Sequence, residues 1–384
     1  MKEIPFNTPY ITGNELGYIA EAIDTLSLSG DGVFTKKCQS FFEQKYGFKK
    51  CLLTTSCTDA LEMAAILFNI QPEDEVIMPS FTFVSTANAF VLRGAKIIFA
   101  DSEEESPNID SSKIEALITK KTKAIVVVHY GGVACEMDEI MNIAERHSLF
   151  VVEDAAQAVD AYYKGRPLGS IGHLAAFSFH STKNIVSGEG GMLVINDSRF
   201  FERSEIIRDK GTNRGQFSRG EVDKYEWTDV GSSFLPSDII AAFLYAQLEQ
   251  LDAIQTIRKT AWLQYWEGLK PLSDAGFFQC LPIAKHKQHN ANLFYIVTRS
   301  EEERARLIST LKKNGISTAF HYLSLHKSPF YASRHDGRNI PNSEMFSSRL
   351  LRLPFFSAIR PEEIERVITQ IKLFYSFHDD SHKR

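Results

Sequence analysis

The chain has 384 residues, 43% of them hydrophobic, and a formal net charge of −5. This length predicts more than one hydrophobic core. The net charge gives no indication of binding to nucleic acid or to a membrane surface. The first residues, MKEIPFNTPY, lack the apolar run of a signal peptide, and no window approaches a transmembrane span. Five irregularly spaced cysteines indicate neither a disulfide framework nor a metal site, so we expect a cytoplasmic protein with reduced thiols and no bound metal.

Short β-branched runs alternate with helical patterns between about residues 50 and 200. In chain order, we expect helix 59–67, strand 76–78, helix 84–91, strand 95–99, helix 114–118, strand 123–128, helix 137–146, strand 149–152 and, after a glycine-rich turn, strand 191–195. Such alternation predicts an α/β domain with a mainly parallel sheet.

The second half of the chain predicts a smaller domain. An Ala- and Leu-rich helix is expected at 237–251, and a long helix at 251–269 leads out of the large domain. Strands at 294–297 and 316–320 and helices at 302–313 and 361–375 follow. We therefore expect a large domain over 1–250 and a small C-terminal α+β domain over 251–384, with a frayed tail at 378–384.

Two segments carry residues suited to chemistry on an aldehyde. In FSFHSTKN (177–184), Lys183 lies between an apolar strand and the glycine-rich GEGG (188–191), where a buried amine can lose its proton and attack a carbonyl. Taken alone, a lysine at such a place is usually solvated. In VVEDAAQ (151–157), a strand runs into Asp154 at its carboxyl end, where ligands of open α/β sheets bind. Asp154 can pair with a protonated ring nitrogen or simply cap a helix.

Two earlier segments are suited to a phosphate and a flat ring. LLTTSCTDALEMAA (52–65) predicts a strand, a turn and a helix start, so that Ser56, Cys57 and Thr58 can hold an anion or merely cap the helix. No Cys–His pattern supports Cys57 as a nucleophile. In MPSFTFVSTANAF (78–90), Phe83 can stack on a flat cofactor or belong to the core. In combination, a phosphate turn, an aromatic, an acid and a lysine fit one planar aldehyde phosphate.

These motifs resemble those of the DegT/DnrJ/EryC1/StrS sugar aminotransferases. The resemblance extends from GDGVFTKKCQSFFEQKYG (30–47) to LRLPFF (351–356), and it includes SCTDALEMA, DEVIMPSFTFVSTANA, VHYGGVACEMD, VVEDAAQ, FSFHSTKN and GEGG. It implies the fold-type I aspartate aminotransferase architecture and a pyridoxal 5′-phosphate cofactor. By position, the family roles fall on Lys183 as the imine-forming lysine, Asp154 at the ring nitrogen, Gln157 beside the phenolic oxygen, Cys57, Thr58 and Ser178 at the phosphate, Phe83 on the ring face, and His321 and Tyr322 near the sugar.

A narrower resemblance concerns the substrate. GDGVFTKKC, VHYGGVACEMD, DKGTNRGQFSRGEVDKYEW and VGSSFLPSD resemble family members that form dTDP-4-amino-4,6-dideoxygalactose. This implies dTDP-4-keto-6-deoxyglucose as substrate, L-glutamate as amino donor, and a homodimer with shared active sites. Arg214 and Arg219, with Lys210 and Lys224, can bind the diphosphate through charge-assisted hydrogen bonds or belong to a solvated loop.

Departures from the family pattern leave alternatives open. Many members carry GYNYRMSD where this chain has GSSFLPSD (231–238), so we do not transfer the roles of that Asn and Arg to Ser233 and Leu235. A C3 aminotransferase acting on a dTDP-3-keto-6-deoxyhexose is one alternative. A dehydratase of the same fold is another, although those enzymes replace the lysine with histidine and Lys183 argues against it. A non-catalytic sensor is the third.

Overall fold

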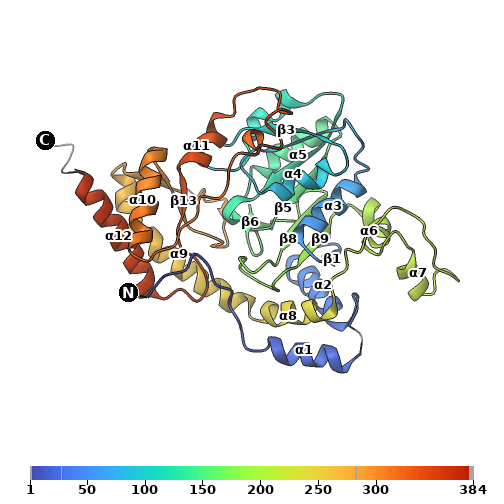
Figure 1. Cartoon of the computed structure of the whole chain (residues 1–384). Helices are drawn as coiled ribbons and strands as arrows, with labels where there is room; N and C mark the ends of the chain where they lie inside the picture. The colour runs from blue at the N-terminus through green and yellow to red at the C-terminus, as the bar shows by residue number, and fades with distance from the viewer. Residues whose placement is uncertain (1, 27, 282, 380–384) are drawn as a thin grey trace.

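The central sheet has seven strands in the order β1-β9-β8-β5-β4-β2-β3 (Figure 1). The computed structural model describes residues 2–26, 28–281 and 283–379. Strand β9 runs antiparallel to both of its neighbours, and the other strand pairs are parallel. The strands are β1 (Cys51–Thr54), β2 (Glu75–Pro79), β3 (Lys96–Ala100), β4 (Thr122–Val128), β5 (Phe150–Asp154), β8 (Leu174–Ser178) and β9 (Gly191–Ile195). The mainly parallel sheet predicted from the sequence is confirmed.

Both faces of this sheet are buried, which explains why its strands read as continuous apolar runs. Along β4, Ile125 and Val127 join one hydrophobic cluster while Ala124 and Val126 join the other. One cluster includes residues of α1 (Glu15–Asp24), α2 (Val33–Tyr46), α5 (Met137–Arg146) and α8 (Asp238–Glu249). The opposite cluster includes residues of α3 (Cys57–Leu67), α4 (Val84–Val91) and α6 (Phe201–Arg208). The result is a three-layer arrangement of helices, sheet and helices.

The C-terminal elements form a second, smaller assembly, reached through the long helix α9 (Leu251–Asp274) (Figure 1). A three-stranded antiparallel sheet, in the order β10-β12-β13, packs with the helices of this region. Ile4 belongs to the same hydrophobic cluster, and its backbone N–H donates to the Gly315 carbonyl over 2.8 Å. The remaining elements are β6 (Tyr162–Tyr163), β7 (Arg166–Pro167), β10 (Phe278–Cys280), β11 (Lys287–Gln288), β12 (Tyr295–Thr298), β13 (Leu350–Arg352), α7 (Arg214–Ser218), α10 (Glu301–Lys313), α11 (Pro341–Arg349) and α12 (Pro361–Asp379).

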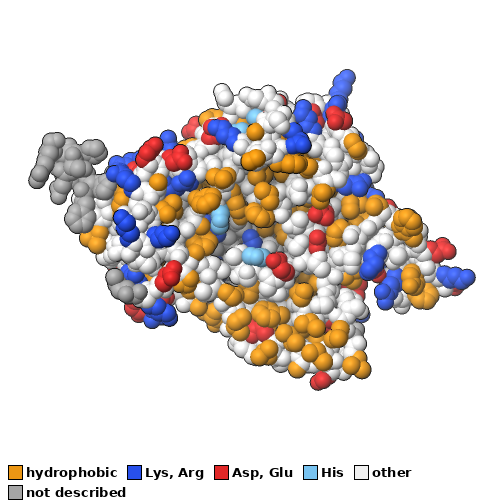
Figure 2. Space-filling model, in the orientation of Figure 1, with side chains coloured by type: hydrophobic (Ala, Val, Ile, Leu, Met, Phe, Trp, Pro, Cys, Tyr) orange, Lys and Arg blue, Asp and Glu red, His pale blue; other side chains and the backbone are white. Residues whose placement is uncertain are grey.

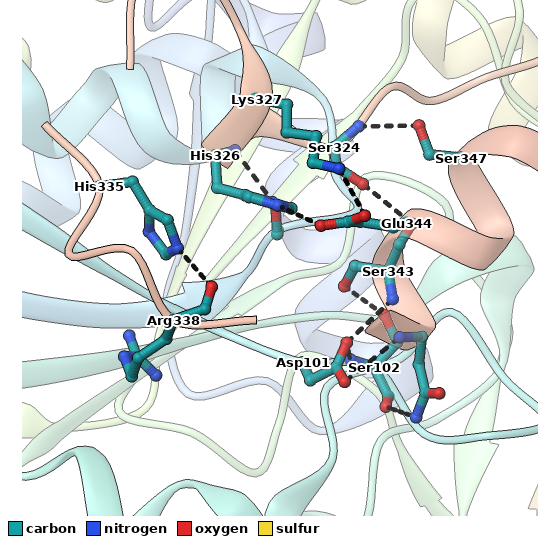
Figure 3. A network of polar contacts seen from close by, with 12 residues as sticks. Asp101, Ser102, Ser324, His326, Lys327, His335, Arg338, Ser343, Glu344 and Ser347 are labelled. Atoms are coloured by element: carbon teal, nitrogen blue, oxygen red, sulfur yellow. Dashed lines mark hydrogen bonds and ion pairs between the residues drawn. The ribbon is translucent and has the colours of Figure 1, made fainter. Parts of the chain in front are cut away.

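A buried polar network fixes the C-terminal segment to the edge of the central sheet (Figure 3). The Ser80 hydroxyl, directly after β2, lies 2.7 Å from Nδ1 of His326, whose Nε2 lies 3.1 Å from Glu344. The Asp101 carboxylate, directly after β3, accepts the Ser343 backbone N–H over 2.9 Å. These contacts hold the segment that carries residues 321 and 322 against the carboxyl ends of two parallel strands.

Two predicted elements are wrong. The helix expected at 114–118 is replaced by two short 3₁₀ turns, Ser111–Lys113 and Glu115–Leu117, because the backbone of Ile118 is already extended on its way into β4. The strand expected at 316–320 forms only single bridges, from Ile316 to Ile4 and from Ala319 to Arg352. That segment crosses between two different neighbours and builds no ladder with either of them. Of the tail expected to fray, residues 380–384 lie outside the described residues.

Candidate active site

A pocket of about 480 Å³ opens at the carboxyl ends of the parallel strands, between the central sheet and the C-terminal segment. Figure 2 shows the molecular face hollowed near its centre, with histidine side chains at the rim and hydrophobic side chains around it. Every cofactor residue predicted from the sequence lines this pocket, as do His321 and Tyr322. Ser56, predicted with Cys57 and Thr58 to hold an anion, lies there too. The lining also includes residues that were not predicted from the sequence: Phe6, Thr82, Ser85, His129, His180, Glu189, Asn292 and Arg352.

Lys183 lies in the turn between β8 and the glycine-rich segment, and its backbone N–H donates to the His180 carbonyl over 2.9 Å. Burial lowers the pKa of its amine, while the nearby Cys57 and Asp154 act in the opposite direction. Arg352 adds to the lowering through its positive charge. A depressed amine pKa raises the fraction of neutral amine, which is the nucleophilic form.

Asp154 is the last residue of β5 and is buried at the pocket floor. Its carboxylate accepts a hydrogen bond from the Thr86 hydroxyl over 2.7 Å and one from the Ala156 backbone N–H over 3.1 Å. Burial raises the pKa of Asp154, and it outweighs these hydrogen bonds, which lower the pKa. No helix begins directly after Asp154, so it is not a helix cap. A cationic group bound in the pocket would stabilise this buried carboxylate.

The amino end of α3 forms one end of the pocket. The Ser56 hydroxyl caps this helix by accepting the Asp59 backbone N–H over 3.1 Å, and the Thr58 hydroxyl donates to Ser85 over 2.8 Å. Gly191 of β9 lies directly against this turn, since a Cβ there would stand 2.4 Å from the Cys57 backbone nitrogen. A helix amino end with small polar side chains is suited to an anion such as a phosphate.

Phe83, Gln157 and Tyr322 meet at another side of the pocket. Phe83 is 53% exposed and is therefore not a core residue. Its ring centroid lies 5.8 Å from that of Tyr322. The Gln157 side chain accepts the Gly131 backbone N–H over 2.6 Å and donates to the Tyr322 hydroxyl over 3.3 Å. A segment distant in sequence thus contacts the residues at the ends of the central strands.

The sequence analysis missed a buried histidine–glutamate pair behind Asp154. His129 Nε2 lies 3.0 Å from Glu153, and the Cys135 backbone N–H donates to His129 Nδ1. Because Nδ1 accepts, the proton of the neutral ring lies on Nε2 and points at Glu153. Burial raises the pKa of Glu153, but the bonds from His129 and from the backbone of Gly172 and Gly169 outweigh it and lower the pKa.

Arg214 and Arg219, predicted to bind a diphosphate, do not line this pocket. They belong to α7 and its flanking loop, which project from the body on the side away from the C-terminal helices (Figure 1). Arg219 forms ion pairs with Glu205 at 2.9 Å and with Glu221 at 2.7 Å. Neither arginine therefore contacts the pocket of its own chain, and their part in substrate binding stays a prediction.

Comparison with known proteins agrees with this fold and this pocket. The model of the DegT/DnrJ/EryC1/StrS aminotransferase family matches residues 9–372. The chain is 32% identical to the spore coat polysaccharide biosynthesis protein SpsC of Bacillus subtilis (strain 168), over 96% of each chain. It is 32% identical to the GDP-perosamine synthase of Escherichia coli O157:H7, over 98% of this chain and 100% of that protein. The crystal structure of S. venezuelae DesV in complex with a ketimine intermediate superposes with a TM-score of 0.87, 29% identity and coverage of 97% and 99%.

The fold and the pocket define a pyridoxal-phosphate-dependent sugar-nucleotide aminotransferase. The chain belongs to the DegT/DnrJ/EryC1/StrS aminotransferase family. The pocket residues fit the cofactor: a lysine amine with a lowered pKa, a buried carboxylate and the amino end of α3 line one cavity. Among the described residues, no group of three or more His, Cys, Asp or Glu side chains could hold a metal ion. No helix in the described part of the chain is long and apolar enough to cross a membrane.

Proposed function

We propose that the enzyme transfers the amino group of L-glutamate to C4 of dTDP-4-keto-6-deoxyglucose and forms dTDP-4-amino-4,6-dideoxygalactose. The observation that carries the reaction class is the meeting of Lys183, Asp154 and the amino end of α3 in one pocket. The sugar assignment rests on the segments VACEMD and GTNRGQFSRGEVDKYEW, which lie outside the cofactor set and resemble family members with this product.

The residues that hold the cofactor follow from the chemistry of the lining. Asp154 pairs with the protonated ring nitrogen, and the Thr86 hydroxyl keeps its carboxylate in place. Ser178, Thr58 and the backbone of Cys57 hold the phosphate at the amino end of α3. Phe83 covers one face of the ring, and Gln157 lies beside the phenolic oxygen. When bound, the cofactor supplies an electron-accepting ring that stabilises negative charge on the reacting carbon.

Lys183 serves as both nucleophile and proton carrier. With the cofactor bound, its amine would form the covalent bond to the cofactor aldehyde; once displaced by the donor amine, it would take the proton from the donor Cα and later supply a proton to C4 of the sugar. Its lowered pKa supports both roles, because the neutral amine is the form that attacks and accepts a proton. Over the full reaction, the amino group and the Cα hydrogen of the donor are exchanged for the keto oxygen of the sugar, by way of water, and the donor leaves as 2-oxoglutarate.

The projecting loop around α7 supports a homodimer with shared active sites. Trp227 in this loop is 83% exposed, and Phe217 and Tyr225 are also exposed at its tip. An exposed tryptophan beside further aromatic side chains is typical of a contact surface. We propose that this loop packs on a second copy of the chain and brings Arg214 and Arg219 to the diphosphate bound in the neighbouring pocket.

Product analysis tests this function. Purified enzyme with cofactor, L-glutamate and dTDP-4-keto-6-deoxyglucose should yield a single amino sugar nucleotide by mass spectrometry. NMR of that product should show the amine at C4 in the axial position, which is the galacto configuration. An equatorial C4 amine, or an amine at C3 formed from a 3-keto substrate, would contradict the substrate assignment and leave the aminotransferase chemistry intact.

A further inference from the structure

Arg352 introduces a cation into the pocket that the cofactor residues do not use. It ends β13 and lines the same cavity as Lys183. One of its terminal nitrogens, Nη1, lies 3.4 Å from Nδ1 of His321, and its guanidinium lies over the Phe6 ring at 5.3 Å from the centroid. Its Nε is buried and has no hydrogen-bond partner among the residues that the structure describes. Neutral groups therefore hold the side chain in place, and its Nε–H is left without an acceptor among the described residues.

The surroundings of Arg352 contain a second arginine but no paired carboxylate. Arg258 is fully buried, donates only to the carbonyls of Ala291 and Asn292 and to the Ser357 hydroxyl, and has its pKa lowered by burial and by the charge of Arg352 to about 9. Within the described ranges, neither arginine forms an ion pair with an acidic side chain. Two neighbouring cations without an acidic partner favour the binding of an anion from solution.

We infer that Arg352 and the Tyr322 hydroxyl form a binding site for the carboxylate of the amino donor. This inference rests on the proposed transamination and adds a recognition site to it. The α-carboxylate of an amino acid is bonded directly to the carbon whose proton Lys183 removes, so its binding site must lie close to the lysine amine. Arg352 and Tyr322 line the same cavity as Lys183, so a carboxylate that they hold lies in the pocket of the lysine amine.

A sugar diphosphate fits this position less well, because it is attached at C1, across the hexose ring from C4. The order of the strands gives a further reason. The phosphate turn follows β1 and Ser178 ends β8, whereas Gln157, which contacts Tyr322, follows β5 on the other side of β8. Arg352 therefore lies on the side of the pocket away from the cofactor phosphate, and an arginine fork suits the two oxygens of a carboxylate.

Binding of unreactive ligands to the holoenzyme tests the site directly. Glutarate has the two carboxylates of glutamate without its amino group, and dTDP has the diphosphate without the sugar. Calorimetric titration should show that Arg352→Gln weakens glutarate binding by about 10- to 100-fold, which is the range for hydrogen bonds to a charged group, and leaves dTDP binding unchanged. The glutarate affinity of Arg352→Lys should lie between those of the wild type and of Arg352→Gln. Lysine keeps the positive charge but cannot donate the two parallel hydrogen bonds of a guanidinium.

Arg349→Gln is the matched control, since Arg349 is exposed at the end of α11 and lies outside the pocket. It should leave both affinities unchanged. Unchanged glutarate binding in Arg352→Gln, or an equal loss of glutarate and dTDP binding, would overturn the inference. A separate reading tests the proposed function: wild-type holoenzyme mixed with L-glutamate alone should change its cofactor absorbance, and no change would reject glutamate as donor whatever the result for glutarate.

Discussion

The Gln157 side-chain amide donates a hydrogen bond to the Tyr322 hydroxyl over 3.3 Å, joining positions 165 residues apart. Through this contact, the C-terminal segment forms a wall of the pocket beside the residues at the strand ends. The polar network around His326 and Glu344 fixes the same segment a few residues further along (Figure 3). Tyr322 is therefore held both by the hydrogen bond from Gln157 and by the anchoring of the segment that follows it.

Tyr322→Phe should lower kcat/KM for L-glutamate roughly 2- to 10-fold, the value of one hydrogen bond, because the ring still packs against Phe81 and only the hydroxyl is lost. Steady-state kinetics measure this effect. Tyr331→Phe is the control: its hydroxyl contacts the Ile97 backbone away from the pocket, so its loss should lower stability and leave kcat/KM unchanged. Equal effects of the two variants on kcat/KM would contradict the assignment.

Neighbouring residues of β5 should give opposite results. Asp154→Asn keeps the shape but loses the charge, so cofactor affinity should fall about 10- to 100-fold and turnover should fall further, with little change in the melting temperature. Glu153→Gln should instead destabilise the fold by about 1–3 kcal/mol, because Glu153 accepts bonds from His129 and from the Gly169, Ile171 and Gly172 backbone. Cofactor titration and thermal unfolding separate the two. Near-normal turnover of Asp154→Asn would make that residue purely structural.

Shared active sites predict complementation between inactive subunits. Lys183→Ala mixed with the double variant Arg214→Ala/Arg219→Ala should regain about a quarter of wild-type activity, since random exchange gives half hybrids with one intact site each. Mixing Lys183→Ala with Asp154→Asn should regain nothing, because both residues line the same pocket of one chain. A fully active monomer that is stable to dilution would contradict the proposal.

His289 should make the stability of the protein depend on pH. Burial, with the charge of Lys259 adding to it, lowers the pKa of His289 from 6.5 to about 4. The unfolded chain therefore binds this proton more readily, and the contribution to stability is present above pH 6.5 and lost as the pH falls toward 4. Between pH 7.5 and pH 4.5, the free energy of unfolding should fall by about 1–3 kcal/mol less in His289→Asn than in the wild type. Urea unfolding at the two pH values measures this difference. An identical pH dependence in variant and wild type would argue against it.

Much of the central sheet and of the cofactor set could be predicted, because both are encoded locally. The apolar runs of β4 and β5 mark strands buried on both faces, Asp154 ends β5, and Lys183 lies in the turn that follows β8. Arg352 was missed because its role depends on a distant segment that returns to the pocket, although a single charge within LLRLPFF is unusual for a buried strand.

The place of the α7 loop could not be predicted for a related reason. Its composition is that of a solvated loop, and only the structure shows that α7 projects from the body (Figure 1) and that Arg214 and Arg219 do not line the pocket of their own chain. The sequence predicts a helix at 114–118, where the structure has the end of two short 3₁₀ turns, because apolar spacing does not show where the backbone must return to the sheet.

Reductive labelling of the holoenzyme tests the central claim most directly. Sodium borohydride reduces an imine between the cofactor and a lysine to a stable bond, and mass spectrometry of the digested protein then identifies the labelled peptide. We expect a pyridoxyl group on the peptide that contains Lys183, and no label in Lys183→Ala treated in the same way. A pyridoxyl group on another lysine, or no label in wild-type protein that has bound the cofactor, would contradict it.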